Sequence, residues 1–164
     1  MSVSEIEELK LACPDKKMEI SKLSQNFTVD DTERKSYSCY LDENNSAIVQ
    51  KIKNTIHSIL PENKQIEIQI LKYDIGGYYA PHYDDFNDVL YEDNRKFTFF
   101  IILENDCSGG ETEFPNLGID LKPDKGSAIF WNCFNSDHTR NINKLHGGKT
   151  VMSGKKMACN IWVR

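Results

Sequence analysis

His82 and Asp84 stand two positions apart in the sequence and could hold a metal ion together. Residues two apart in an extended strand point to the same face, so an imidazole nitrogen and a carboxylate oxygen could reach one ion. Two histidines and one carboxylate on one face leave three coordination positions open, which suits non-haem Fe(II) and dioxygen chemistry. The pair alone is a weak signal because its spacing is common by chance, so a third ligand must come from elsewhere in the chain.

The candidate third ligand is His146, which Lys156 follows ten positions later. An ammonium group near the metal would pair with the distal carboxylate of a dicarboxylate co-substrate, because a carboxylate buried without a cation is costly. His138 is a rival to His146, but no lysine stands ten positions after it. His57 falls in a predicted amphipathic helix and is expected on the helix surface.

These residues belong to a longer series that resembles the catalytic domain of the prolyl 4-hydroxylases, within the Fe(II)- and 2-oxoglutarate-dependent dioxygenases. The resemblance runs from about residue 34 to residue 162, and the order and spacing of its members carry it. The matching positions are Tyr73, Gly77, Tyr79, His82, Asp84, Arg95, Thr98, residues 109–115, Gly126, His146, Lys156 and Trp162. The sequence departs from the family pattern at residues 149–151, where the family often has Cys-Pro-Val, and at Met157, where a tryptophan usually follows the lysine.

The resemblance implies an enzyme that hydroxylates peptidyl proline while it decarboxylates 2-oxoglutarate to succinate and CO2. His82, Asp84 and His146 would bind Fe(II) as the catalytic centre, and Lys156 would bind the C5 carboxylate of 2-oxoglutarate. O2 would be the co-substrate, and ascorbate would rescue iron oxidised in uncoupled turnover. Two alternatives stay open: a related oxygenase acting on another side chain, a small molecule or a nucleic-acid base, and a jelly-roll binding module without turnover.

The resemblance also assigns five supporting residues. Tyr73 and Thr98 would lie near the C5 carboxylate of 2-oxoglutarate, and Trp162 near the co-substrate, although Tyr73 and Trp162 are also typical core residues. Tyr79 would point toward the substrate pocket. Arg95 would contact the substrate backbone, with an exposed salt bridge as an equal interpretation.

The segment 84–94 is acidic and holds Asp85, Asp88, Glu92 and Asp93. The resemblance implies a mobile loop here that covers the peptide, and clustered negative charge would favour basic peptides because it raises their encounter rate. The net charge of −5 and the pI of about 5.4 argue against a nucleic acid as partner.

Periodic patterns predict the elements that would position these groups. A helix is expected at residues 4–13, ended by Pro14, and a second at 48–59, capped by the polar turn 42–46 and ended by Pro61. Strands are expected at 66–70, 97–103, 111–114, 127–131 and 157–163, with turns at 106–110 and 123–126. Short strands after helices suggest a sandwich or jelly roll. The fold class is mainly β (α+β), a double-stranded β-helix with supporting N-terminal helices.

The chain of 164 residues is the size of one domain, with residues 1–33 expected as a weakly patterned N-terminal extension and 34–164 as the catalytic core. The five cysteines are widely spaced and odd in number, which predicts reduced thiols. No apolar run is long enough to span a membrane, and no basic patch precedes an apolar run at the start, so a cytoplasmic or intracellular location is expected. The oligomeric state stays open.

Overall fold

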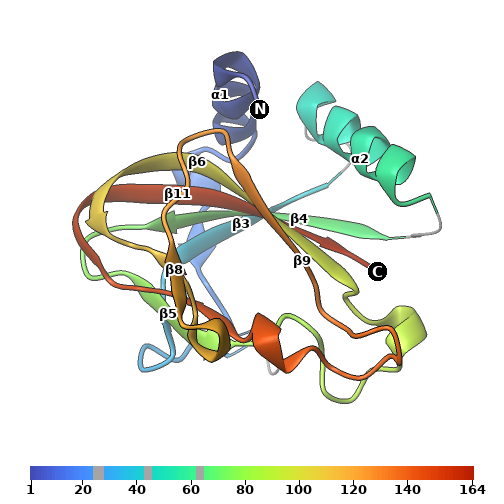
Figure 1. The fold of residues 1–164 in the computed structure, drawn as a ribbon. Helices are drawn as coiled ribbons and strands as arrows, with labels where there is room; N and C mark the ends of the chain where they lie inside the picture. Colours follow the sequence, from blue (N-terminus) through green and yellow to red (C-terminus); the bar gives the residue numbers. More distant parts are fainter. Residues whose placement is uncertain (24–27, 43–45, 62–64) are drawn as a thin grey trace.

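The computed structural model describes residues 1–23, 28–42, 46–61 and 65–164, and it contains two antiparallel sheets with two α-helices packed on one of them (Figure 1). The larger sheet has the strand order β1-β3-β4-β11-β6-β9, and the smaller one has the order β2-β5-β10-β7-β8. The helices and strands are α1 (Val3–Ala12), β1 (Glu19–Ile20), β2 (Arg34–Lys35), β3 (Tyr37–Leu41), α2 (Ala47–Ile59), β4 (Ile66–Tyr73), β5 (Tyr78–His82), β6 (Phe97–Gly109), β7 (Thr112–Phe114), β8 (Ile119–Leu121), β9 (Ala128–Asn132), β10 (His146–Gly148) and β11 (Val151–Val163). This mainly β arrangement confirms the predicted jelly-roll class.

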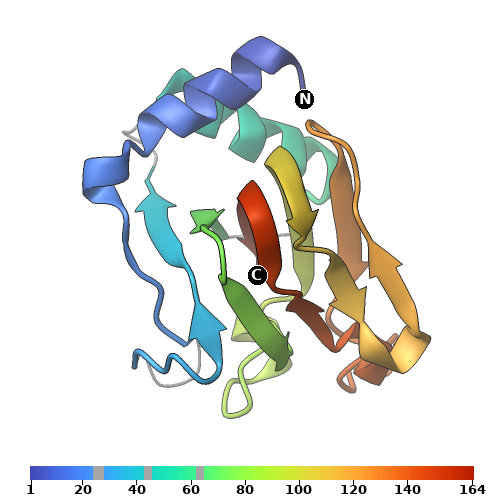
Figure 2. The same ribbon diagram turned by 90° about the vertical axis from the view of Figure 1, so that its left-hand side faces the viewer.

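Alternation along the central strands divides the core into two layers. In β6, Ile101 and Leu103 face the helices, whereas Phe100 and Ile102 face the smaller sheet. The apolar run 97–103 is therefore covered on both faces, as its composition predicts. Figure 2 shows the two helices lying across one face of the larger sheet.

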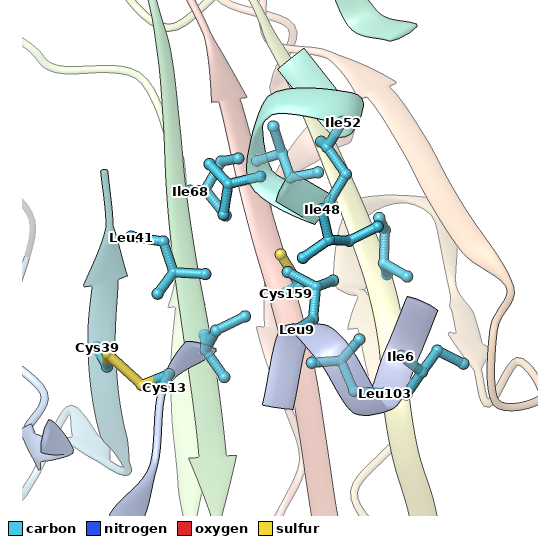
Figure 3. Close-up of a cluster of buried hydrophobic side chains, with 14 of the residues drawn as sticks. Ile6, Leu9, Cys13, Cys39, Leu41, Ile48, Ile52, Ile68, Leu103 and Cys159 are labelled. Carbon is cyan, nitrogen blue, oxygen red and sulfur yellow. A yellow bond between two sulfur atoms is a disulfide. The ribbon is translucent and has the colours of Figure 1, made fainter. Parts of the chain in front are cut away.

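The helices begin and end where local chemistry permits. Ser2 caps α1 by accepting a hydrogen bond from the backbone N–H of Glu5, and the Glu5 carboxylate accepts one from the backbone N–H of Ser2. Ile6 and Leu9 of this helix are fully buried against the sheet (Figure 3). Residues within the first 33, weakly patterned in sequence, thus contribute to the core. The division at residue 34 stays a prediction.

The second helix, α2, matches the expected span within one residue at its start, and His57 is exposed on its surface as expected. Residues 43–45 of the predicted capping turn lie outside the described residues. Ser46 is the N-cap residue, but its hydroxyl makes no capping hydrogen bond. Packing of Ile48, Ile52 and Ile56 on the sheet therefore fixes this helix.

The predicted turn at 106–110 starts too early. Strand β6 continues to Gly109, because β11 is equally long and pairs Lys155 with Asp106 and Gly154 with Cys107. A Cβ at Gly154 would lie 1.9 Å from the Asp106 carbonyl oxygen, and the Gly154 φ of +75° also favours glycine. This ladder was not visible in the sequence because its outer half is polar.

The prediction of reduced thiols is wrong for two of the five cysteines. Cys13, at the end of α1, is bonded to Cys39 of β3, and their Cα atoms are 6.3 Å apart (Figure 3). Cys107, Cys133 and Cys159 are free. Sequence spacing gave no hint because the pairing depends on where α1 docks on the sheet. The intracellular location stays a prediction.

No helix in the described parts of the chain has both the length and the apolarity needed to cross a membrane.

Candidate active site

Three side chains predicted to bind metal converge at one end of the smaller sheet. His82 ends β5, Asp84 follows it, and His146 begins β10, which pairs with β5 so that His146 lies opposite His82. One ligand atom from each of the three residues lies within 4.8 Å of the other two. The Nε2 atoms of His82 and His146 lie 3.9 and 3.6 Å from the Asp84 carboxylate oxygens.

Backbone carbonyls orient both imidazoles. Nδ1 of His82 lies 2.9 Å from the Ala80 carbonyl oxygen, and Nδ1 of His146 lies 2.8 Å from that of Lys144. A carbonyl oxygen only accepts, so each Nδ1 carries the hydrogen and each Nε2 keeps its lone pair toward Asp84. This is the tautomer that a histidine needs in order to bind a metal through Nε2.

The charges at this site suit a divalent cation. Burial and the neighbouring His146 lower the pKa of His82 to about 3, so this imidazole is neutral at neutral pH. Burial opposes ionisation of Asp84, but the two imidazoles, Arg95 and a hydrogen bond from Thr98 outweigh it and lower its pKa. Two imidazoles and one carboxylate form the donor set of non-haem Fe(II) sites, so the residues fit that ion.

Lys156 lies in a cavity beside the triad and is only 3% exposed. Its Nζ lies 3.5 Å from the Thr112 hydroxyl and 5.5 Å from the centre of the Tyr73 ring. Burial lowers the pKa of Lys156 to about 8. The cavity is lined by Leu71, Tyr73, Tyr79, His82, Phe100, Thr112, Trp131, His146, Gly147, Gly148, Lys156 and Asn160. It therefore joins both histidines of the triad to a buried cation.

Thr98 and Trp162 do not line this cavity, contrary to expectation. Thr98 pairs with Trp162 across β6 and β11, six residues along β11 from Lys156, which amounts to roughly 20 Å of strand. The Thr98 hydroxyl instead donates a 2.7 Å hydrogen bond to Asp84 Oδ2. Its role is therefore to hold the carboxylate of the triad.

Thr112, Trp131 and Asn160 line the cavity without having been predicted there. Asn160 could have been found, because it follows Lys156 by four positions in one strand and so points to the same face. Thr112 belongs to the segment 109–115 that the resemblance already contains. The ring centre of Trp131 lies 4.6 Å from that of His146.

Tyr79 lines the same cavity and packs directly on the triad, and its role toward the substrate stays a prediction. Its ring stacks on the His82 imidazole with the two centres 3.6 Å apart. The Arg34 guanidinium covers the Tyr79 ring at 4.4 Å and donates to the Ser36 hydroxyl. Arg34 was not predicted, because nothing in its local sequence marks it.

Arg95 forms an ion pair, as one of its two interpretations holds, but a buried one. Its side chain is buried, donates a 2.7 Å hydrogen bond to Glu67 Oε2 and lies over the Trp162 ring at 3.7 Å. Its contact with a substrate backbone stays a prediction.

The acidic segment divides into a buried and an exposed part. Asp85 is 4% exposed and accepts two hydrogen bonds from Arg140, so it is not available to a passing substrate. Asp88, Glu92 and Asp93 are exposed. His138, the rival ligand, stacks on Tyr91 and lies outside the triad.

Comparison with known proteins agrees with this geometry. Residues 68–164 match the 2OG-Fe(II) oxygenase superfamily. Prolyl 4-hydroxylase subunit alpha-1 of Gallus gallus is 32% identical over 140 residues, which cover 79% of this chain and 27% of that protein. Prolyl 4-hydroxylase 1 of Arabidopsis thaliana is 31% identical, with 74% of this chain and 50% of that protein covered. The chain thus spans between about a quarter and a half of these relatives.

Solved structures share the fold over the whole chain. The viral collagen prolyl hydroxylase of Paramecium Bursaria Chlorella virus-1, as a complex with 2OG, has a TM-score of 0.79 and 26% identity, covering 100% of this chain and 91% of that one. A Pseudomonas putida prolyl-4-hydroxylase, at 15% identity, has a TM-score of 0.73 and covers 99% and 84%, which shows the fold alone. Since the family match includes the strands that carry the triad and Lys156, this chain belongs to the 2OG-Fe(II) oxygenase superfamily.

Proposed function

We propose that this domain is a prolyl 4-hydroxylase-like enzyme that hydroxylates proline in peptides or proteins at the expense of 2-oxoglutarate and O2. One observation carries the proposal: two oriented imidazoles and a carboxylate meet beside a cavity that ends on a buried lysine. Likeness to prolyl 4-hydroxylases supports proline as the substrate residue.

Nε2 of His82, Nε2 of His146 and a carboxylate oxygen of Asp84 would hold Fe(II). When bound, Fe(II) with 2-oxoglutarate activates O2, so that decarboxylation to succinate and CO2 is coupled to oxidation of a substrate C–H bond. The carbonyls of Ala80 and Lys144 keep both imidazoles in the required tautomer. The Thr98 hydroxyl donates a hydrogen bond to one lone pair of Asp84 Oδ2, which leaves the other lone pairs of the carboxylate for the ion.

Lys156 would bind the C5 carboxylate of 2-oxoglutarate, and the Thr112 hydroxyl lies close enough to donate a second hydrogen bond to it. Phe100 and Tyr73 line the same cavity and exclude water, which strengthens the pairing of ammonium and carboxylate. Tyr79, stacked on His82, would form the wall between the co-substrate and the peptide. In this proposal, ascorbate is the reductant that keeps the iron ferrous.

The experiment is a hydroxylation assay on a panel of proline-rich peptides with Fe(II), 2-oxoglutarate and ascorbate, read by mass spectrometry and by succinate release. We expect a proline residue to gain one oxygen atom, with one succinate formed per hydroxylation. Succinate release with every proline unmodified would contradict the substrate assignment but not the oxygenase chemistry. Absence of succinate under all conditions would favour a binding module without turnover.

A further inference from the structure

Two loops that meet next to the triad each lead to one of its ligands. The loop of residues 83–96 joins β5 to β6 and holds Asp84 near its start. The loop of residues 133–145 joins β9 to β10 and ends one residue before His146. Both loops lie at the lower edge of the molecule in Figure 1 and Figure 2. The relative position of the two loops therefore affects how the ligands are arranged.

Arg140 of the second loop reaches across to the first. Its Nε and one terminal nitrogen donate hydrogen bonds of 2.8 and 2.7 Å to Asp85 Oδ2, and the same terminal nitrogen donates to Asn87 Oδ1. The guanidinium also lies 4.7 Å from the centre of the Tyr83 ring. Arg140 thus contacts the residues on both sides of Asp84.

The pair balances a charge that the protein has buried. The Asp85 side chain is 4% exposed and that of Arg140 is 32% exposed. A carboxylate removed from water needs a cation or hydrogen-bond donors, and Arg140 supplies both. Without Arg140, a second buried carboxylate would lack this cation in the residue that directly follows Asp84.

Further contacts join the same two loops. The Tyr91 ring stacks on His138 at 3.8 Å and meets the edge of Phe134 at 5.1 Å. The Tyr83 hydroxyl donates to the Ile142 carbonyl. Arg140 differs from these contacts because it acts on Asp85, which is bonded directly to Asp84.

We propose that Arg140 is a positioning residue of the metal centre. By fixing Asp85 from the loop that leads to His146, it sets the backbone of Asp84 relative to His146. Thr98 fixes the Asp84 carboxylate from the opposite side, through β6. Arg140 touches neither the metal nor the substrates and acts through Asp85. The inference rests on the proposed function, because it requires that the triad binds metal.

The test is the affinity of metal-free protein for Co(II), measured by calorimetric titration without co-substrate. We compare Arg140→Gln, Asp85→Asn and the double variant. Lys125→Gln is the matched control, because it breaks a 3.2 Å ion pair with Glu7 on α1, away from the triad. Thermal melting reports whether each variant folds.

We expect Arg140→Gln to weaken Co(II) binding by about 10-fold, the lower end of the range for losing groups that orient metal ligands, because Arg140 acts through Asp85. The double variant should regain most of this affinity, because two amides can hydrogen-bond to each other and no unpaired carboxylate remains. Lys125→Gln should bind like the wild type. A purely structural role would lower the melting temperature without this recovery.

A Co(II) affinity of Arg140→Gln equal to that of the wild type would overturn the proposal, as would a double variant no better than the single one. If Arg140→Gln does not fold, Asp85→Asn decides: we expect a smaller loss of affinity, and an unchanged affinity would overturn the positioning role. Failure of the wild type to bind Co(II) would instead remove the metal triad, and with it the proposed function.

Discussion

Lys156 combines a buried side chain with a positive charge, and the combination has two measurable consequences. The residue is 3% exposed, and its ammonium has the Thr112 hydroxyl at 3.5 Å as a polar neighbour. Burial lowers its pKa from 10.5 to about 8. The group is therefore unfavourable for the fold and suited to binding an anion.

The first consequence concerns binding of 2-oxoglutarate. Only protonated Lys156 attracts the carboxylate, and the free protein loses this proton as the pH rises through about 8. We expect the dissociation constant to be flat below about pH 7 and to increase about tenfold per pH unit well above 8. Equilibrium dialysis with Mn(II) present measures it.

Lys156→Arg is the control for this pH dependence, because a guanidinium stays protonated up to about pH 12. Its dissociation constant should stay flat between about pH 8 and 10. If the dissociation constant rose equally with pH in both proteins, a group other than Lys156 would be titrating. His82 is not that group, because its pKa of about 3 leaves it neutral throughout this range.

The second consequence concerns stability. Unfolded Lys156 keeps a proton up to its ordinary pKa of 10.5, whereas the folded protein releases it near 8, so stability should rise with pH between these values. Lys156→Met removes the buried charge, and we expect about 1–3 kcal/mol of added stability at pH 7 together with loss of 2-oxoglutarate binding. Urea denaturation measures the free energy of unfolding. A Lys156→Met variant less stable than the wild type would show that interactions within the protein offset the burial of the ammonium.

Substitution of two threonines distinguishes binding of the metal from binding of the co-substrate. Thr98→Val removes the 2.7 Å hydrogen bond to Asp84, so we expect metal affinity to fall by about tenfold or more. Thr112→Val should leave metal affinity unchanged and raise the KM for 2-oxoglutarate by about tenfold, because that hydroxyl lies beside Lys156. Each variant is the control for the other, because both make the same isosteric change. A loss of metal affinity in Thr112→Val and a raised KM in Thr98→Val would contradict the two roles.

At the scale of elements, the sequence predicts the apolar and polar faces of single strands but not which strands pair with each other. The apolar runs predicted the buried halves of β4, β6 and β11. The polar half of the β6–β11 ladder and the pairing of β10 with β5 depend on contacts distant in sequence. The resemblance alone placed Thr98 near the co-substrate, whereas its position along β6 relative to Lys156 follows from the register of β6 with β11.

The disulfide between α1 and β3 is a second contact between elements that the sequence did not predict. Cys13 and Cys39 join α1 to β3 across 26 residues, so we expect reduction to lower the free energy of unfolding by about 2–4 kcal/mol. Denaturation with and without a phosphine reductant measures this. The Cys13→Ser/Cys39→Ser variant should not respond to the reductant. Titration of five rather than three thiols in denatured, unreduced protein would contradict the bond.

At the scale of the whole molecule, the two sheets divide their tasks. The larger sheet places its outer face under α1 and α2, and its inner face carries Lys156 and Thr98 toward the smaller sheet. The smaller sheet carries His82 and His146 on adjacent strands. The site therefore forms only when both sheets are in register, which is why its ligands are so far apart in sequence.

The most direct test of this account is the rate of succinate release from 2-oxoglutarate, with Fe(II) and a proline-rich peptide, in two histidine variants. His146→Ala should lose activity to the background level. His138→Asn should keep the wild-type rate, because His138 stacks on Tyr91 outside the triad and asparagine tolerates its positive φ. Wild-type succinate release by His146→Ala, or loss of it only in His138→Asn, would contradict the proposed metal centre.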